Sequence, residues 1–179
     1  EVVRNSIEEL ENHWLIFDKI NTKTKEINIH LSGGYGDKKS DKERFIKVAK
    51  ELPFLKNITI ENDELTYSIE DCLEVSKELN IPVTFDIHHH KCHLLNKDYK
   101  SEYTDVISII NDCKKTWIKR GYNHMRIHLS SPKDGYSTSS KSRPHTDLIN
   151  EEDMNDLSFL KLDNDLNIHI DVEAKHKEV

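Results

Sequence analysis

Five short segments of the sequence alternate aliphatic and polar residues, and each polar face ends in a side chain that can bind a metal ion. These terminal residues are His30, Glu61, Asp86, His128 and Glu173. Alternation at a period of two is typical of β-strands, and apolar residues at helical spacing separate the segments. Strands that alternate with helices indicate parallel strands joined by crossover helices.

Helices and strands are predicted to alternate along the whole chain. Apolar residues recur at intervals of three and four, as in amphipathic helices, at about 2–20, 37–52, 68–79, 103–119 and 151–162. The alternating segments fall at about 26–32, 55–62, 83–86, 125–128 and 168–173. A serine at 68 with an aspartate three residues on is typical of a capped helix start. The polar stretch 129–150 is predicted to be a loop.

Metal-capable residues at the ends of five consecutive strands favour a closed barrel over an open sheet. A (β/α)8 TIM barrel collects its chemistry at the C-terminal ends of its strands, whereas a doubly wound sheet does so near one switch point. We therefore predict an α/β fold in which residues 1–179 are a single domain, a partial TIM barrel of about five βα units. A whole barrel has roughly 250 residues, so we expect three N-terminal units to precede Glu1 and to be missing here.

The charge balance argues against nucleic-acid binding over a broad basic surface. The sequence has 26 Lys and Arg residues against 33 Asp and Glu residues, a formal net charge of -7. A local basic groove beside an acidic metal site remains compatible with that balance. Three widely spaced cysteines indicate an intracellular compartment, cytoplasmic or nuclear. No apolar run approaches the ~18 residues of a membrane span, so we expect no membrane partner.

The spacing of residues after the third strand indicates a metal site. Asp86 and His89 lie three apart, so both side chains can reach one point if the chain turns where the strand ends. His88 and His90 are then expected to support the ligands or to face substrate. Histidines mixed with carboxylates favour Mn²⁺, Zn²⁺ or Fe²⁺ over Ca²⁺, and so many ligands require more than one ion. Such clusters serve phosphodiester hydrolysis and also sugar isomerisation, and the ligand types alone do not separate the two.

Six motifs, taken in order, resemble the signatures of the UV damage endonuclease family. They are His30-Leu-Ser-Gly-Gly-Tyr-Gly-Asp-Lys38, Thr59-Ile-Glu-Asn-Asp63, Phe85-Asp-Ile-His-His-His90, Arg126-Ile-His-Leu-Ser-Ser131, Arg143-Pro-His145 and Asp171-Val-Glu-Ala-Lys-His-Lys-Glu178. The resemblance runs from about Glu26 to Glu178. The ordered set is specific, although no single motif is.

This resemblance implies a (β/α)8 DNA repair enzyme, related in architecture to endonuclease IV. Such an enzyme nicks double-stranded DNA on the 5′ side of UV photoproducts and leaves a 3′-hydroxyl. It uses a cluster of up to three divalent ions, usually Mn²⁺, with Mg²⁺ or Zn²⁺ as alternatives. The resemblance assigns the metal ligands to His30, Glu61, Asp86, His89, His128, His145 and Glu173. It also implies catalytic roles for Glu61, Glu173 and His128, the two glutamates by tying the ions together.

Arg126 is a departure from the family pattern. The family commonly carries a carboxylated lysine two residues before the histidine matched by His128, and arginine cannot form that carbamate. The family's first two metal histidines and its lesion-probing residues would lie in the N-terminal units expected before Glu1.

Basic residues near the predicted rim are candidates for DNA contact. Lys133 and Arg143 lie in the loop 129–150 and supply positive charge that the overall composition lacks, so we expect them to contact the DNA backbone. Lys38 opens a predicted helix and is a third candidate, with a solvated lysine as the alternative. We expect a monomer. The alternative functions are an apurinic-site endonuclease, a sugar isomerase or epimerase, and a lesion-binding protein without catalysis.

Overall fold

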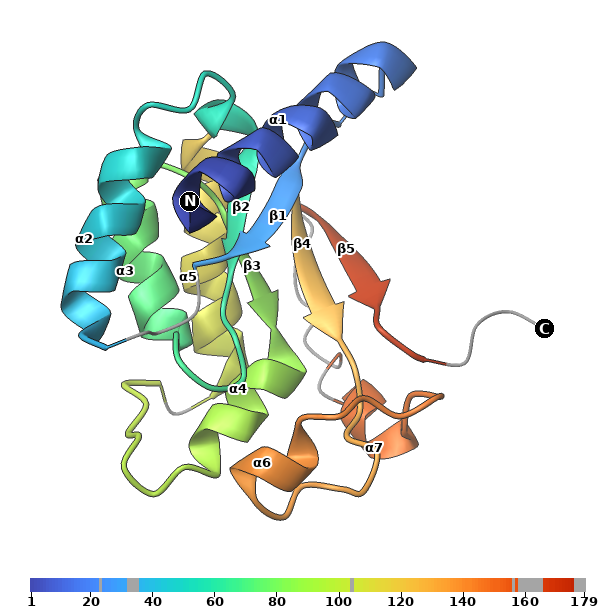
Figure 1. The fold of residues 1–179 in the computed structure, drawn as a ribbon. Coiled ribbons are helices and arrows are strands. Elements are labelled where there is room, and N and C mark those ends of the chain that lie inside the picture. The colour runs from blue at the N-terminus through green and yellow to red at the C-terminus, as the bar shows by residue number, and fades with distance from the viewer. Residues whose placement is uncertain (23, 32–35, 104, 156, 158–165, 176–179) are drawn as a thin grey trace.

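Five parallel strands form one sheet in the order of the chain (Figure 1). The computed structural model describes residues 1–22, 24–31, 36–103, 105–155, 157 and 166–175. The strands are β1 (Ile27–His30), β2 (Ile58–Glu61), β3 (Val83–Asp86), β4 (His124–Leu129) and β5 (Asn167–Val172). The predicted α/β class with parallel strands is confirmed.

The helices follow the predicted alternation. They are α1 (Val2–Ile20), α2 (Lys38–Ala49), α3 (Ile69–Leu79), α4 (Ile87–Leu94), α5 (Val106–Lys119), α6 (Ser139–Ser142) and α7 (Glu151–Met154), with a 3-10 turn η1 (Leu55–Asn57). The start of α3 has the predicted capping box, because Ser68 Oγ accepts from Asp71 N and the Asp71 carboxylate accepts from Ser68 N. No helix among the described residues is both long and apolar enough to cross a membrane.

One face of the sheet is aliphatic and is covered by α3 and α5, with α2 packed beside α3 (Figure 1). Its fully buried strand residues include Ile58, Ile60, Val83, Phe85 and Ile127. Burying one such side chain stabilises the fold by roughly 1.5–3 kcal/mol. The indole of Trp117 in α5 is also fully buried, and its Nε1 donates to the carbonyl of Val83 at 2.7 Å. This layer fixes the strands on which the polar face depends.

The opposite, polar face of the sheet is concave. Glu26, just before β1, pairs with two side chains of β4, at 2.8 Å to His124 Nε2 and 2.8 Å to Arg126 Nε. In a flat sheet β1 and β4 would lie about 14 Å apart, at ~4.8 Å per strand. The sheet therefore curls around its polar side chains and brings together residues from strands that are not neighbours.

Three segments differ from the predicted elements. Residues 55–57 form η1 instead of the start of a strand, because the chain makes a tight turn between Pro53 and β2. The histidine run after β3 forms α4, where no helix was predicted, because Asp86 caps a helix at that point. The loop 129–150 contains the one-turn helix α6. Of the predicted helix at 151–162, only Glu151–Met154 form an α-helix, α7, among the described residues, and residues 156 and 158–162 lie outside the described part of the chain.

Candidate metal centre

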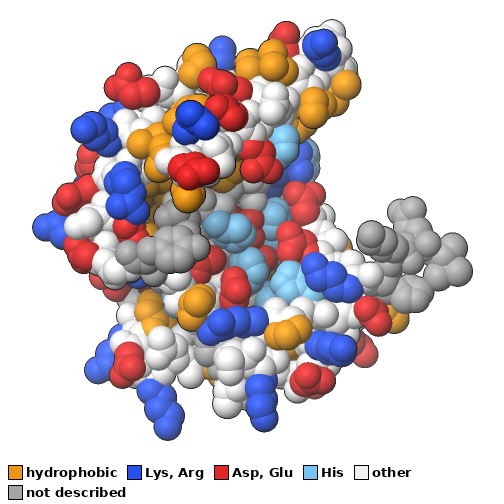
Figure 2. Space-filling model, in the orientation of Figure 1, with side chains coloured by type: hydrophobic (Ala, Val, Ile, Leu, Met, Phe, Trp, Pro, Cys, Tyr) orange, Lys and Arg blue, Asp and Glu red, His pale blue; other side chains and the backbone are white. Residues whose placement is uncertain are grey.

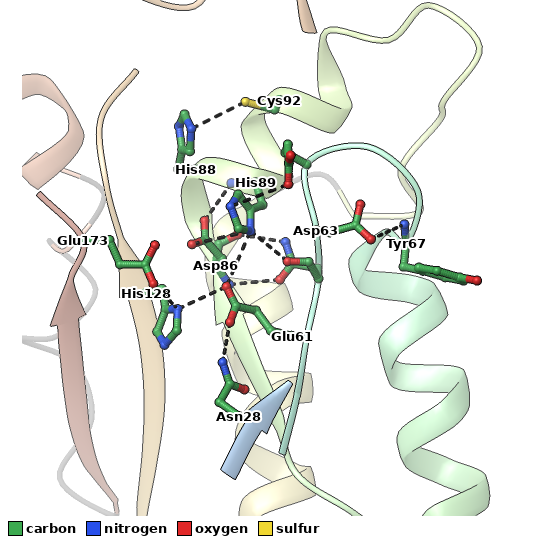
Figure 3. A network of polar contacts seen from close by, with 12 residues as sticks. Asn28, Glu61, Asp63, Tyr67, Asp86, His88, His89, Cys92, His128 and Glu173 are labelled. Carbon is green, nitrogen blue, oxygen red and sulfur yellow. Dashed lines mark hydrogen bonds and ion pairs between the residues drawn. The ribbon is translucent and has the colours of Figure 1, made fainter. Parts of the chain in front are cut away.

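Two carboxylates converge on one imidazole at the C-terminal end of the sheet (Figure 3). Nδ1 of His128 lies 3.1 Å from Glu61 Oε1 and 3.2 Å from Glu173 Oε1. The three residues come from the ends of β4, β2 and β5. Their ligand atoms lie within 4.8 Å of one another, close enough for one ion to be held by all three.

A second ligand group adjoins the first and shares Glu61. His30, Glu61 and His89 also offer ligand atoms within 4.8 Å of one another. His89 Nδ1 lies 3.5 Å from Glu61 Oε1, and the His30 and His89 rings are 5.6 Å apart. Glu61 is therefore the side chain that the two groups share.

Asp86 and His89 meet because the chain turns into α4 directly after β3. Asp86 Oδ1 accepts a hydrogen bond from His89 N at 2.7 Å, which is helix N-capping across three residues. The same turn carries the His89 ring over the carboxylate, with Nδ1 at 3.6 Å from Asp86 Oδ2. A spacing of three thus brings both side chains together at the C-terminal end of β3.

Asp86 indicates that the site suits a cation. Its side chain is fully buried, and within the described part of the chain Oδ2 has no hydrogen-bond partner. Burial raises the pKa of this carboxyl to about 7. A buried carboxylate oxygen without a hydrogen bond is costly, and a bound cation would offset that cost. Together with the imidazoles and glutamates around it, this donor set fits a divalent transition-metal ion.

His128 and Glu173 are strongly coupled electrostatically. Burial acts to lower the pKa of His128, but its hydrogen bonds to Glu173 and Glu61 prevail and raise that pKa to about 10. The hydrogen bond from His128 lowers the pKa of Glu173 to about 2. The imidazolium holds together two carboxylates that would otherwise repel each other. A bound metal ion would offset the same repulsion.

His145 reaches the site from the loop after β4. An antiparallel bridge pairs it with Pro132, and its Nδ1 lies 3.6 Å from Glu173 Oε2. The His145 ring is 5.9 Å from the His89 ring. Asp86 and His145 thus lie next to the two ligand groups. Neither residue is a member of a group whose ligand atoms all lie within 4.8 Å of one another. All seven expected ligands lie in one region of the molecule.

A model of the UV-endonuclease UvdE family matches residues 1–179. The chain belongs to this family. The match begins at the first residue, so the expectation of a resemblance confined to about Glu26–Glu178 is wrong, and α1 is part of it.

Relatives of this UvdE-family chain carry the name UV DNA damage endonuclease. One from Bacillus velezensis is 32% identical over 183 residues, which cover 99% of this chain and 53% of the relative. One from Clostridium perfringens is 39% identical over 134 residues, which cover 73% and 31%. A structure described as "Crystal Structure of SacUVDE" is similar with a TM-score of 0.77 and 30% identity, over 99% of this chain and 55% of that one. The chain spans about half the length of the curated relatives it matches.

Arg126 lies on the polar face of β4 and is held in ion pairs. Its Nε donates to Glu26 Oε2 at 2.8 Å, and Nη1 donates to Asp171 Oδ2 at 3.0 Å. Asp171 Oδ2 lies 3.7 Å from Nε2 of His128. In this UvdE-family chain the arginine therefore cross-links β4 to β5 and to the residue before β1.

The three candidate DNA-contacting residues have different surroundings. Lys38 pairs with Asp71 and lies over the Tyr67 ring, so it stabilises the junction of α2 and α3. Lys133 is exposed. Arg143 is half-buried, and its carbonyl lies 3.2 Å from His88 Nε2. Figure 2 shows Lys and Arg side chains on the same face as the gathered histidines and carboxylates.

Two residues at the site were not predicted from the sequence. Asn62 is fully buried, and its side chain bonds both the N and the O of Asp86, at 2.9 Å each, while its own carbonyl lies 2.9 Å from His89 Nδ1. Glu64 Oε2 lies 3.9 Å from His89 Nε2. Their only signal in the sequence was their place in the segment 62–64 that follows Glu61, and an amide or a carboxylate in a turn usually has a local role instead.

Proposed function

We propose that this chain is part of a metal-dependent DNA repair endonuclease that hydrolyses the phosphodiester 5′ to UV photoproducts and leaves a 3′-hydroxyl. The observation that carries the proposal is Glu61, which is shared by two adjacent ligand groups at the C-terminal end of a parallel sheet. Paired divalent ions suit in-line displacement at phosphorus. The names of the relatives supply the class of substrate.

The concave sheet is, in this proposal, five βα units of a (β/α)8 barrel that form a single domain, with three further units on the N-terminal side. The reach of Glu26 to β4 supports this because only strong curvature brings those residues together. The role of each residue in this proposal follows from its place at the C-terminal end of the sheet. His30, Glu61, Asp86, His89, His128, His145 and Glu173 hold up to three ions, with Mn²⁺ first and Mg²⁺ or Zn²⁺ as alternatives.

Each part of the site has a distinct task in this account. Bound ions would supply Lewis acidity at the scissile phosphodiester. Glu61 and Glu173 would hold the ions, and the His128 ring is oriented between these two carboxylates. Lys133 and Arg143 contact the phosphate backbone of double-stranded DNA, and Lys38 contributes from the start of α2. The protein acts as a monomer.

A duplex oligonucleotide with one UV photoproduct, incubated with the protein that includes the proposed N-terminal units, tests the proposal. With Mn²⁺ we expect a single cut on the 5′ side of the lesion, with a 3′-end that a DNA polymerase can extend. The undamaged duplex and the same duplex with excess chelator should stay intact. An otherwise identical duplex with one abasic site identifies the apurinic-site alternative.

A second candidate, lesion binding without catalysis, is favoured by Arg126, whose guanidinium cannot carry the family's carbamate. It predicts that the protein retards the damaged duplex in a gel but leaves it uncut with Mn²⁺. That outcome, in folded protein that binds Mn²⁺, would overturn the endonuclease proposal.

A further inference from the structure

A line of hydrogen bonds crosses the polar face of the sheet and ends at Glu61. The Thr84 hydroxyl on β3 lies 3.4 Å from Thr59 Oγ1 on β2, and Thr59 Oγ1 lies 2.8 Å from Asn28 Oδ1 on β1. Asn28 Nδ2 then donates to Glu61 Oε2 (Figure 3). The strand register places Asn28 beside Thr59, so the backbone itself sets up the contact.

The direction of this line is determined by its last acceptor. An ionised carboxylate only accepts hydrogen bonds, so the amide group that faces Glu61 must be the NH₂ of Asn28. The amide oxygen then faces Thr59, whose hydroxyl donates to it and can accept from Thr84 in turn. Thr59 and Thr84 are fully buried, so each hydroxyl depends on a protein partner.

The two oxygens of Glu61 consequently have different neighbours. Oε2 accepts from Asn28. Oε1 faces both imidazoles, at 3.1 Å from His128 Nδ1 and 3.5 Å from His89 Nδ1. His128 belongs to one ligand group and His89 to the other. A single oxygen of Glu61 therefore lies between the two groups.

We propose that Asn28 is a positioning residue for the metal centre. It holds Oε2 of Glu61, so that Oε1 alone is presented between the two ligand groups, and the Thr59 hydroxyl fixes the orientation of the Asn28 amide. This inference rests on the metal centre of the proposed function. Some side chains do not bind the ion themselves but orient a metal ligand by a hydrogen bond. Removing such a side chain typically weakens metal binding by about 10–100-fold.

Substitutions at two positions separate positioning from packing. Asn28→Leu keeps the volume and removes the donor to Glu61. Thr59→Val keeps the shape of the side chain and removes the hydroxyl, whereas Thr59→Ser keeps the hydroxyl and removes a methyl group. If the line of hydrogen bonds matters, serine preserves metal binding and valine does not. If only packing matters, serine is the more damaging change because it leaves a cavity.

Mn²⁺ titration of the purified protein and of the three variants, followed by competition with a fluorescent chelator, tests the proposal. Thermal unfolding of the metal-free proteins verifies that each variant is folded. We expect Asn28→Leu to weaken Mn²⁺ binding by about 10–100-fold and Thr59→Val by about 3–10-fold, with Thr59→Ser within about two-fold of the parent.

Parental affinity in Asn28→Leu would overturn the positioning role while leaving the proposed function intact. Equal losses in Thr59→Ser and Thr59→Val would overturn the role of the Thr59 hydroxyl. Absence of Mn²⁺ binding by the parent protein itself would overturn the metal centre, and with it both proposals.

Discussion

His128 lies between two carboxylates that come from different strands. Without a metal ion its imidazolium neutralises part of the charge of Glu61 and Glu173, and the shifted pKa values of His128 and Glu173 reflect that pairing. With a metal ion the same atoms become ligands. The three residues are therefore arranged for cation binding before any ion arrives.

Glu173→Gln tests this arrangement at one side chain. The amide keeps the size of the glutamate but loses its charge, so it cannot pair with His128 or serve as an anionic ligand. We expect Mn²⁺-dependent incision to fall by at least about 100-fold. The metal-free protein should lose about 1–2 kcal/mol of unfolding free energy at pH 7, because the charged hydrogen bond to His128 is lost from a half-exposed site.

The matched control is Glu152→Gln on the exposed first turn of α7, which should cut damaged DNA at the parental rate. Near-parental activity in Glu173→Gln would remove this residue from the ligand set.

Arg126 is expected to affect stability, because its partners Glu26 and Asp171 are not among the candidate metal ligands. The Glu26 side chain is 3% exposed and depends on Arg126 and His124 for compensation of its charge. Removing one partner of a buried ion pair commonly costs 3–5 kcal/mol, and the partial exposure of Arg126 reduces that figure. We expect Arg126→Met to lower the free energy of unfolding by about 2–3 kcal/mol in urea denaturation.

Arg126→Lys should cost less, about 1 kcal/mol, because one charge remains although it cannot reach both carboxylates. Equal losses in the two variants would show that the ion pairs contribute nothing. If Arg126→Lys also cuts DNA faster than the parent, the lysine modification is what the arginine lacks.

At the scale of elements, the start of α3 anchors the segment that follows α4. Glu70 accepts hydrogen bonds from Tyr99 Oη at 2.6 Å and Ser101 Oγ at 2.7 Å. Burial acts to raise the pKa of Glu70, but these hydrogen bonds prevail and lower it to about 2. The Glu70 carboxylate therefore joins α3 to the segment that follows α4. The helix α4 carries His89.

Glu70→Gln should lower the free energy of unfolding by about 1–2 kcal/mol at pH 7, because hydrogen bonds to a charged acceptor are lost from a half-exposed site. The pKa of Glu70 is lower in the folded protein than the ~4.3 of an unfolded chain. Its stabilising effect is complete above that value and is lost as the pH falls towards 2. Urea denaturation at pH 7 and pH 3 should thus show a smaller difference between parent and variant at pH 3, and a constant difference would contradict the assignment.

The sequence predicted most elements and failed where a local contact decides the conformation. β2 and β3 were predictable because Ile58, Ile60, Val83 and Phe85 alternate with polar residues. α4 was not predicted because its histidines give no apolar periodicity, and only the capping carboxylate of Asp86 shows why a helix starts there.

The site followed the same rule. Strand ends were enough to predict that Glu61, Asp86 and His128 lie close together, because parallel strands bring their C-terminal ends to the same edge of the sheet. His145 came only from the family resemblance, since a loop residue has no position until the loop is folded. Asn28 was visible as a polar strand residue, but its role depends on a register across strands that single segments do not encode.

At the scale of the whole molecule, metal binding should be linked to stability. Glu61, Asp86 and Glu173 bring three carboxylates to one concave surface, and ions bound only by the folded state stabilise it by mass action. At 100 times the dissociation constant, Mn²⁺ should add about 2.7 kcal/mol, seen as a rise in the thermal midpoint that excess chelator reverses. A midpoint that does not respond to Mn²⁺ would contradict this linkage.

The most direct measurement is anomalous diffraction from crystals of the protein grown with Mn²⁺, with data collected at the manganese absorption edge. We expect two anomalous peaks, one among Glu61, His128 and Glu173 and one among His30, Glu61 and His89, with Glu61 Oε1 between them. Peaks elsewhere, or no peak at Glu61 in Mn²⁺-saturated protein, would contradict a metal centre organised by this glutamate.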